Sequence, residues 1–506
     1  MKESKYFFSV AMVVVAMAAT IVACSSDDPK QDYNPLIDDP KPEKPTEQPT
    51  TQTERNEQYR PQIHFTPAKN WMNDPNGMVY VDGTWHLFYQ YNPKGNDWGN
   101  MSWGHATSTD LIHWTEQAVA LTRDELGDIF SGSAVIDKDN TAGFGAKAMV
   151  AIYTSASGAQ QQSIAYSTDG SKSFTRYSGN PVIKNNDDNL RDPKVFWHEG
   201  TKQWIMALAK GRKMGVDFYS SPDLKSWTHQ STFFMELAGR ASIQWECPDL
   251  IQMGNKWVLL VSVNPGGPIL GSGTMYFVGD FDGKTFTADA LDYPLWLDFG
   301  MDNYAGVTWS NTGDRKVMMG WMNNWQYAGA VPCSPWRSAM TLPRELKLIE
   351  YGGKPLLANT VVSEIDKIAG QWQTAGADLD VKDAYQLRIT LNLDKNSTIT
   401  LSNSADEKYV LDVNSTARTL TAHRTSATGK SSFNGSFSVP SIQAPLNVTG
   451  NTVTLDLFVD QSSVEIFTQN GSMSMTNLVF PQSVYNRLTV EGASYEAKVR
   501  PLKSIW

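Results

Sequence analysis

A short motif returns four times between residues 61 and 345, and this repeat limits the folds that the chain can adopt. Each copy is a polar turn containing an aspartate, followed a few residues later by an aromatic residue and a threonine. The four aspartates are Asp110, Asp169, Asp223 and Asp282, and successive copies are 59, 54 and 59 residues apart. A fixed period of this length, with strand-like sequence between the copies, indicates an architecture of repeated units.

The sequence between the turns predicts β-hairpins. Residues 77–89, for example, place Asp82-Gly83 between two runs rich in β-branched and aromatic residues. No long segment with helical periodicity interrupts these hairpins. Repeated four-stranded units are typical of a β-propeller, and residues 303–322 supply strands for a fifth unit. We therefore predict an all-β chain whose residues 61–345 form a five-bladed β-propeller.

The pattern changes after about Ser363. Residues 385–393 and 452–467 alternate apolar and polar side chains, and Gly, Asn, Ser and Asp separate the strands. Such short alternating strands are typical of a β-sandwich. Residues 346–506 are therefore expected to hold a linker and a C-terminal β-sandwich domain.

Two segments before the propeller read as an export signal and a spacer. Residues 1–24 combine a basic start, an apolar run and a final cysteine, and Ile-Val-Ala-Cys24 resembles the lipobox of bacterial lipoproteins. A retained membrane-spanning helix is the alternative, because the apolar run is nearly long enough to cross a bilayer. Residues 25–60 carry six prolines and predict a disordered tether that reaches about 100 Å when fully extended.

Location and partners follow from these segments and from the charge. Acidic residues directly after Cys24 resemble the signal that sends some lipoproteins to the outer cell surface, so we expect an outer-membrane lipoprotein, with a periplasmic location as the alternative. We expect membrane contact only through lipid on Cys24, and a monomer. The net charge of −10 offers no attraction for nucleic acid. Three cysteines are too few for a disulfide framework, and although Cys247 and Cys333 could pair, we expect both to be free thiols.

Three acidic residues occupy equivalent places in three of the repeats. Asp74, Asp192 and Glu246 each stand just before a predicted hairpin, and their spacings of 118 and 54 residues are about two periods and one. In a propeller the first strand of each blade lines the central channel, so equivalent positions on different blades meet near the axis. The repeats therefore predict that three carboxylates distant in sequence lie together.

Crowded carboxylates repel one another and split their pKa values, which is a mark of a functional site. Glycoside hydrolysis uses this arrangement, with one protonated acid for the leaving oxygen and one ionised carboxylate. Two other interpretations stay open. In the first, the acids belong only to turns at strand starts, because Asp-Pro is common turn chemistry. Three carboxylates also suit a calcium ion, although the adjacent Arg191 would weaken its binding.

The motifs around these acids resemble those of glycoside hydrolase family 32, the fructofuranosidases, which include invertases, inulinases and levanases. The strongest is residues 71–77, Trp-Met-Asn-Asp-Pro-Asn-Gly, and Arg191-Asp192-Pro193 and Glu246-Cys247 follow in the family's order. The resemblance extends from Ile63 to the C-terminus. It also implies a five-bladed propeller followed by a β-sandwich.

The resemblance implies a retaining double displacement on a fructosyl unit, with no metal or organic cofactor. Asp74 is implied to be the nucleophile and Glu246 the acid/base, with their carboxyl groups about 5–5.5 Å apart. Asp192 is implied to stabilise the transition state, with Arg191 keeping it ionised. The residues implied to surround the sugar are Asn73, Gln90, Trp98, Phe130, Ser131, Arg191 and Trp321.

Three functions remain open at this point. The first is an exported hydrolase of a fructan polysaccharide, for which we favour levan over inulin and consider endo-cleavage reasonable because a tethered enzyme must make fragments small enough to import. An exo-acting enzyme of the inulinase or invertase type is its alternative. The second is a related propeller hydrolase acting on arabinan or xylan, which usually inverts configuration. The third is a non-enzymatic glycan-binding lipoprotein.

Overall fold

The computed structural model describes residues 55–185, 189–237 and 243–506. The predicted signal segment, Cys24 and nearly all of the predicted tether lie outside these residues. Every regular element in the described chain is a β-strand, apart from four short 3-10 helices, η1 (Gly211–Lys213), η2 (Ala328–Ala330), η3 (Ser363–Lys367) and η4 (Ser426–Thr428). Within the same ranges, no helix has the length and apolar character to cross a membrane. The all-β prediction is confirmed.

Five sheets follow one another along the first part of the chain. Blade 1 contains β1 (Asn70–Val81), β2 (Thr84–Tyr91), β3 (Ser102–Ser108), β4 (Thr115–Glu116) and β20 (Trp336–Arg337). Blade 2 contains β5 (Asp128–Asp137), β6 (Ala148–Ser157), β7 (Ala159–Ser167) and β8 (Thr175–Arg176). Blade 3 contains β9 (Leu190–His198), β10 (Gln203–Lys210), β11 (Gly215–Ser221) and β12 (Thr228–Phe234).

Blade 4 contains β13 (Gln244–Met253), β14 (Lys256–Asn264), β15 (Gly273–Phe281), β16 (Phe286–Ala288) and β17 (Leu295–Trp296). Blade 5 contains β18 (Tyr304–Thr308), β19 (Val317–Met322), β21 (Ala339–Met340), β22 (Arg344–Tyr351) and β23 (Lys354–Val361). The propeller was expected to end at residue 345, but β22 pairs with β19 and β23 pairs with β22, so the fifth sheet continues to Val361.

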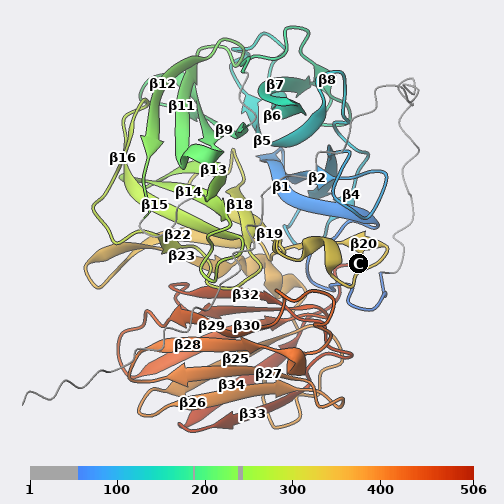
Figure 1. Ribbon diagram of the computed structural model, residues 1–506, viewed down its shortest axis with the longest axis vertical. Coiled ribbons are helices and arrows are strands. Elements are labelled where there is room, and N and C mark those ends of the chain that lie inside the picture. The colour runs from blue at the N-terminus through green and yellow to red at the C-terminus, as the bar shows by residue number, and fades with distance from the viewer. Residues whose placement is uncertain (1–54, 186–188, 238–242) are drawn as a thin grey trace, which may run out of the picture. The chain divides into compact units, whose positions relative to one another are not determined.

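The first strand of each blade lies at the centre of the ring (Figure 1). β1 contacts β5, β5 contacts β9, β9 contacts β13, β13 contacts β18, and β18 returns to β1. These contacts close the ring, and the number of sheets agrees with the five blades expected from the repeats. Apolar side chains fill the space between neighbouring blades, as between blades 3 and 4, where Phe218 and Phe233 pack in one cluster with Trp245 and Phe277.

The repeated aspartate is explained by the turn that connects the last two strands of a blade. The Oδ1 atom of Asp223 accepts hydrogen bonds from the backbone N–H groups of Lys225 and Ser226, at 2.9 and 2.7 Å. Asp110 and Asp282 accept equivalent bonds in blades 1 and 4. Aspartate suits this position because its short side chain caps the backbone of its own turn. The period in the sequence is therefore the period of one blade.

The C-terminal part is a β-sandwich of two sheets, as predicted. One sheet contains, in spatial order, β24 (Gln373–Thr374), β34 (Tyr495–Pro501), β25 (Tyr385–Asn392), β30 (Thr452–Val459), β31 (Ser463–Thr468) and β32 (Ser474–Leu478). The other contains β29 (Val439–Pro445), β28 (Thr419–Arg424), β27 (Lys408–Asn414), β26 (Ser397–Ser402) and β33 (Arg487–Glu491).

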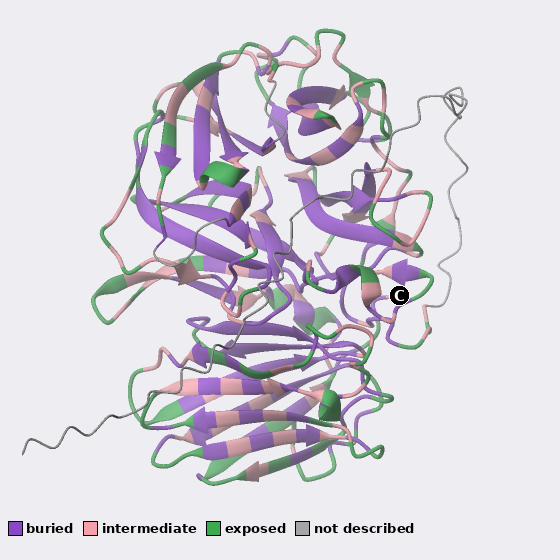
Figure 2. Ribbon diagram, viewed as in Figure 1, coloured by how far each residue is buried: buried purple, intermediate pink, exposed green. Residues whose placement is uncertain are grey.

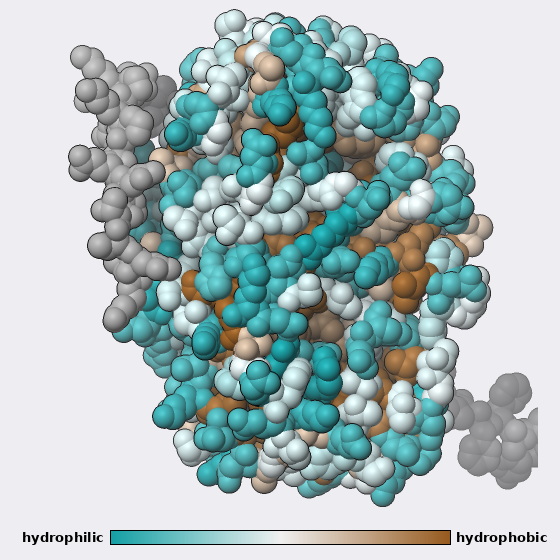
Figure 3. All heavy atoms as spheres, turned by 180° about the vertical axis from the view of Figure 1, so that it is seen from behind, coloured by the Kyte–Doolittle hydropathy of each residue, from teal (hydrophilic) through white to brown (hydrophobic). Residues whose placement is uncertain are grey.

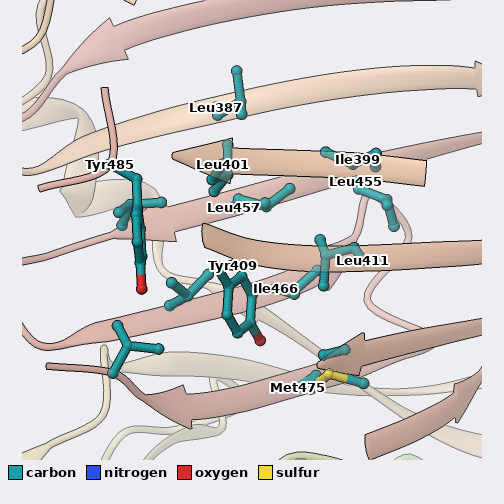
Figure 4. Close-up of a cluster of buried hydrophobic side chains, with 14 of the residues drawn as sticks. Leu387, Ile399, Leu401, Tyr409, Leu411, Leu455, Leu457, Ile466, Met475 and Tyr485 are labelled. Carbon is teal, nitrogen blue, oxygen red and sulfur yellow. The ribbon is translucent and has the colours of Figure 1, made fainter. Parts of the chain in front are cut away.

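Alternating side chains build the sandwich core. In β25 the buried residues Leu387, Ile389 and Leu391 alternate with half-buried polar residues, which appears as stripes along the strands in Figure 2. Side chains from both sheets meet between them, where Leu387 and Leu457 of one sheet lie near Leu401 of the other (Figure 4). On the molecular face in Figure 3, hydrophobic side chains occupy small separate areas within a largely hydrophilic surface.

A buried network of charges joins propeller and sandwich. His64 lies between two sandwich carboxylates, with Nδ1 2.7 Å from Asp460 Oδ2 and Nε2 2.8 Å from Glu465 Oε1. Arg344 pairs with the same Glu465 and, at 2.8 Å, with Asp298 of the propeller. None of these side chains is more than 1% exposed. Because each charge has a partner, the junction avoids the cost of an isolated buried ion.

Candidate active site

All five central strands carry a β-bulge near their first residues. The register shifts fall at Met72–Pro75, Ile129–Gly132, Arg191–Lys194, Glu246–Asp249 and Tyr304–Val307. A bulge adds one residue to a strand and redirects a side chain, and bulges are common beside active sites. Asp192, Cys247 and Ala305 within them have φ angles of 64°, 47° and 54°, in the left-handed region that costs such residues about 1–3 kcal/mol. The fold therefore holds strained backbone at one end of the channel, where the predicted acids lie.

Asp74 comes from the bulge of β1 and is held by three neighbours. Asn73 Nδ2 donates to its Oδ1 at 3.1 Å, and Ser131 Oγ donates to its Oδ2 at 2.6 Å. The Cys247 thiol donates to the same Oδ2 at 3.5 Å. Trp71 Nε1 donates to Asn73 Oδ1 at 2.8 Å, which fixes the amide with its nitrogen toward Asp74. One oxygen of Asp74 thus has two donors from blades 2 and 4.

Glu246 comes from the bulge of β13, and its side chain is 18% exposed. Arg191 donates to its Oε1 through Nε and Nη2, at 3.1 and 2.6 Å. Gln244 Nε2 donates to the same oxygen at 3.0 Å, and the Tyr304 hydroxyl donates to Oε2. Of the three acids, Glu246 is thus the most exposed and is held from blades 3 and 5.

Asp192 lies deeper, at the bulge of β9. Its Oδ2 accepts the backbone N–H of Cys247 at 3.0 Å and lies 3.6 Å from the Cys247 sulfur. Its own backbone N–H donates to Thr154 Oγ1 at 3.0 Å. Cys247 therefore contacts both aspartates, and the three acids predicted from the repeats are brought together.

Burial and mutual repulsion set the ionisation of the site. Burial raises the pKa of Asp74, and the nearby Glu246 raises it further, while the hydrogen bond from Ser131 opposes the shift. Burial raises the pKa of Asp192 to about 7, against the lowering effect of Arg191. Burial and the surrounding carboxylates raise the pKa of Cys247 well above its usual value, so the thiol stays protonated. A cluster of acids with displaced pKa values is typical of acid–base chemistry.

Arg191 contacts two of the three acids. The resemblance implied that Arg191 keeps Asp192 ionised. Its guanidinium lies 4.0 Å from Asp192 and lowers the pKa of that carboxyl, although burial has the larger effect and the pKa is raised. The shorter contacts of Arg191 are its two hydrogen bonds to Glu246, which orient that side chain.

Aromatic side chains stand at the entrance to the carboxylates. Trp98 is 50% exposed, and its ring lies edge-on to Phe130 with 6.1 Å between ring centroids. Phe130 is half-buried and directly precedes Ser131, the donor to Asp74. Exposed aromatic faces beside polar groups provide the mixed surface that a sugar ring requires.

Two residues expected to contact the sugar are placed further back. Gln90 is 2% exposed, and its amide donates to Asn76 Oδ1 and to the backbone oxygen of Ile129, which ties β1 to β5. Trp321 is 0% exposed, donates to the backbone oxygen of Met72 and packs against Trp71. The expectation that Trp321 offers a sugar-binding face is wrong for this structure, because no part of its ring reaches the surface.

Tyr304 is a site residue that the sequence did not suggest, as are Gln244 and Thr154. It lies 58 positions after Glu246, close to the repeat period, at the start of the central strand of blade 5. The same phasing that located the acids therefore locates Tyr304, but only if the search includes residues other than acids. Burial and the adjacent Glu246 raise its pKa well above the usual value, so its hydroxyl is a donor.

The described residues contain no group of three or more His, Cys, Asp or Glu arranged to hold a metal ion. Cys247 and Cys333 are both free and buried, as expected. The site is therefore a set of carboxylates with hydrogen-bond donors, open on one side to aromatic side chains. A propeller with such a set at the mouth of its channel, followed by a β-sandwich, is the architecture of a glycoside hydrolase.

Comparisons with known proteins place the chain within this class. Residues 64–359 match the family model for the glycosyl hydrolases family 32 N-terminal domain, and residues 358–505 match that for the family's C-terminal domain. The chain belongs to glycosyl hydrolase family 32 and is a β-fructofuranosidase-type enzyme.

Similar proteins cover most of the chain. A levanase of Bacillus subtilis (strain 168) is 43% identical over 89% of this chain and 71% of its own length. An extracellular exo-inulinase of Aspergillus awamori is 39% identical over 88% of this chain and 95% of its own. The crystal structure of an exo-inulinase from Aspergillus awamori superposes with a TM-score of 0.83 at 35% identity, over 90% of this chain and all of that one.

Proposed function

We propose that this chain hydrolyses the β-fructofuranosidic bonds of a fructan, with levan favoured, and retains the anomeric configuration. The observation that supports this most is the contrast between the acids. Asp74 is buried among donors that stabilise its charged form, whereas Glu246 is more exposed, as a group that exchanges protons with a leaving oxygen and with water must be. The levanase among the relatives favours levan as substrate.

The proposed reaction has two steps. Asp74 attacks C2 of the fructosyl unit, the bond to the leaving oxygen breaks, and Glu246 gives that oxygen its proton. Glu246 then takes a proton from water, whose oxygen attacks C2 and releases Asp74. Asp192, joined to Cys247 by a backbone hydrogen bond, stabilises the positive charge that develops on the sugar ring.

The test is hydrolysis of levan, inulin and sucrose, with products followed by chromatography and by NMR of the first anomer released. We expect levan to be cleaved fastest, with retention. Asp74→Ala should lower kcat by at least about 10⁴-fold, because it removes the attacking group. The matched control is Asp128→Ala, a half-buried aspartate of β5 that pairs with Arg123 at 3.3 Å. Inversion at C2, or full activity of the Asp74 variant, contradicts the proposal.

A second candidate, exo-acting release of fructose, is supported by the similarity to the exo-inulinase structure over its full length. Chromatography of early levan products separates the two modes. A ladder of oligosaccharides indicates endo-cleavage, which we consider reasonable for a tethered enzyme, and free fructose alone indicates exo-cleavage.

We also propose that the chain is a monomeric lipoprotein of the cell surface, anchored only through Cys24. The lipobox-like sequence, the acidic residues after it and the extracellular relatives support this location. Cys24→Ala should move activity from the membrane fraction to the soluble fraction, while leaving kcat on sucrose unchanged, since residue 24 precedes the whole propeller. Protease treatment of intact cells tests exposure, and a surface-anchored enzyme loses its activity. Retention of the Cys24 variant in membranes contradicts lipid anchoring.

A further inference from the structure

Blade 3 ends in a groove on the same side of the propeller as the acids. Arg191 and Asp192 lie at the first residues of β9, and the antiparallel strands bring Lys210, Gly215 and Phe234 to that end. Lys210 pairs with Gly215, and Gly215 pairs with Phe234, so the three form one row across the sheet. The row extends outward from the strand that carries Asp192.

The groove has a volume of about 480 Å³ and is lined by Lys210, Lys213, Met214, Gly215, Thr232 and Phe234. Phe234 is 54% exposed, although large apolar side chains are normally covered in a folded protein. Gly215 contributes no side chain to the groove. A Cβ at this position would lie 3.2 Å from the backbone oxygen of Phe233, which is a tight contact. The groove thus combines an open aromatic face with the aliphatic parts of two lysine side chains.

Exposed apolar side chains are concentrated at this end of the propeller. Among the described residues, four large apolar side chains are exposed, namely Trp98, Phe234, Leu270 and Tyr495. Trp98 follows β2, Phe234 ends β12 and Leu270 lies between β14 and β15, all at the end that carries the acids. Only Tyr495, in β34, belongs to the sandwich. The exposed apolar surface of the propeller therefore surrounds the site opening.

We propose that this groove binds fructosyl units of a polymer whose reacting unit lies at Asp74 and Glu246. Neighbouring strands are about 4.8 Å apart, so Phe234 lies about 14 Å outward from β9. A disaccharide held at the acids ends short of that distance, whereas a polymer continues to it. The proposal rests on the proposed function, because it takes a fructan as the substrate.

The chemistry of the groove suits a neutral, hydroxyl-rich chain. The ring of Phe234 offers an apolar face to the C–H groups of a sugar. Lys210 is held in place by Asp217, at 2.9 Å, and Thr232 Oγ1 donates to the same aspartate at 2.5 Å. The exposed lining of the groove is therefore mainly apolar, and the C–H faces of sugar rings are the groups that it contacts. The polymer therefore gains binding energy remote from the reacting bond, and short substrates do not.

The test compares Phe234→Ala with the wild type on long levan and on sucrose. Loss of one aromatic contact should raise KM for levan about fivefold, while kcat/KM on sucrose stays within experimental error. Tyr495→Ala is the matched control, since it removes an exposed aromatic side chain from the sandwich and should change neither substrate. Equal effects on levan and sucrose, or no effect on levan, would overturn the proposal.

A binding measurement separates this proposal from the proposed function. Electrophoresis in native gels containing levan measures affinity without turnover, and Asp74→Ala should be retarded more than Asp74→Ala/Phe234→Ala. Suppose that the wild type cleaves no fructan, but that Phe234→Ala still reduces retardation in levan gels. The catalytic proposal then fails, and the proposal that the groove binds fructan is supported. If cleavage of levan is normal and retardation is independent of Phe234, the groove proposal fails alone.

Discussion

At the scale of single residues, the site is organised by donors placed against two carboxylates. Asp74 receives hydrogen bonds from Asn73, Ser131 and Cys247, and Glu246 receives them from Arg191 and Tyr304 among others. Donors that face an ionised carboxylate stabilise its charge and counteract the effect of burial. The same burial raises the pKa of Asp74, so the activity of the enzyme depends on how well these donors compensate.

Ser131→Ala should move the acid limb of the kcat/KM profile to higher pH. The nucleophile must be ionised, so activity is lost as pH falls through the raised pKa of Asp74. Ser131 lowers that pKa, and a hydrogen bond to a charged group contributes about 1.5–3 kcal/mol, which corresponds to a shift of at least about one pH unit.

Ser133→Ala is the matched control for this shift. Ser133 lies two positions along the same strand, and its hydroxyl donates to the backbone oxygen of Pro193 at 2.8 Å instead of to an acid. The variant should leave the acid limb in place. An unchanged limb in the Ser131 variant would show that its hydroxyl does not stabilise the reactive form of Asp74.

At the scale of elements, β32 of the sandwich holds the segment that leads into the site. The backbone N–H groups of Phe299 and Asp302 donate to Ser474 and Thr476 of β32, at 2.9 and 3.0 Å. Two residues later the chain reaches Tyr304, which donates to Glu246. The sandwich thus supports the propeller at a point close to the chemistry, and the charged network around His64 stabilises the same junction.

His64→Gln should destabilise the protein most below neutral pH. The folded-state pKa of His64 is raised to about 9, because Asp460 and Glu465 outweigh its burial. Because the folded protein binds this proton more tightly than the unfolded chain, protonated His64 increases the free energy of unfolding. This contribution is fully present below the unfolded pKa of 6.5 and is lost as pH rises through the folded pKa of about 9. The difference from wild type in the free energy of unfolding should therefore shrink, by on the order of 3 kcal/mol, between about pH 6 and about pH 10.

Urea unfolding followed by fluorescence at several pH values measures this difference. His113→Gln is the control, because His113 is 51% exposed and pairs with Asp110 at the surface. A pH-independent difference for His64→Gln would mean that the imidazole is neutral in the folded protein.

Glu465 sets the behaviour of the same network at acidic pH. Its pKa is lowered to about 2, because Arg344 and His64 outweigh its burial. Its contribution to stability is therefore present above the unfolded pKa of 4.5 and is lost as pH falls through about 2.

At the scale of the whole molecule, the sequence predicts the features that recur in every blade. It does not predict the features that depend on one particular pair of strands or side chains. The turn aspartates and the phased acids Asp74, Asp192 and Glu246 predict the ring, because each blade uses the same local chemistry. The end of blade 5 at Val361 was not predictable in this way, since β22 joins the sheet by pairing with β19. The burial of Trp321 also depends on neighbours from blade 1, and no local pattern distinguishes it from the exposed Trp98.

The first described residues are fixed to the last ones and to the sandwich. The guanidinium of Arg55 lies 3.8 Å from the ring centroid of Trp506, whose Nε1 donates to the backbone oxygen of Pro61. The backbone N–H of Gln62 donates to Asp460 at 2.8 Å. If the chain is anchored through residues before 55, a large polymer bound to the enzyme pulls it away from the anchor. The contacts of Arg55, Pro61 and Gln62 with Trp506 and Asp460 then bear that force. Arg55 also pairs with Glu116 of β4, the edge strand of blade 1. Mechanical force is then shared between the propeller and the sandwich from the first described residues onward.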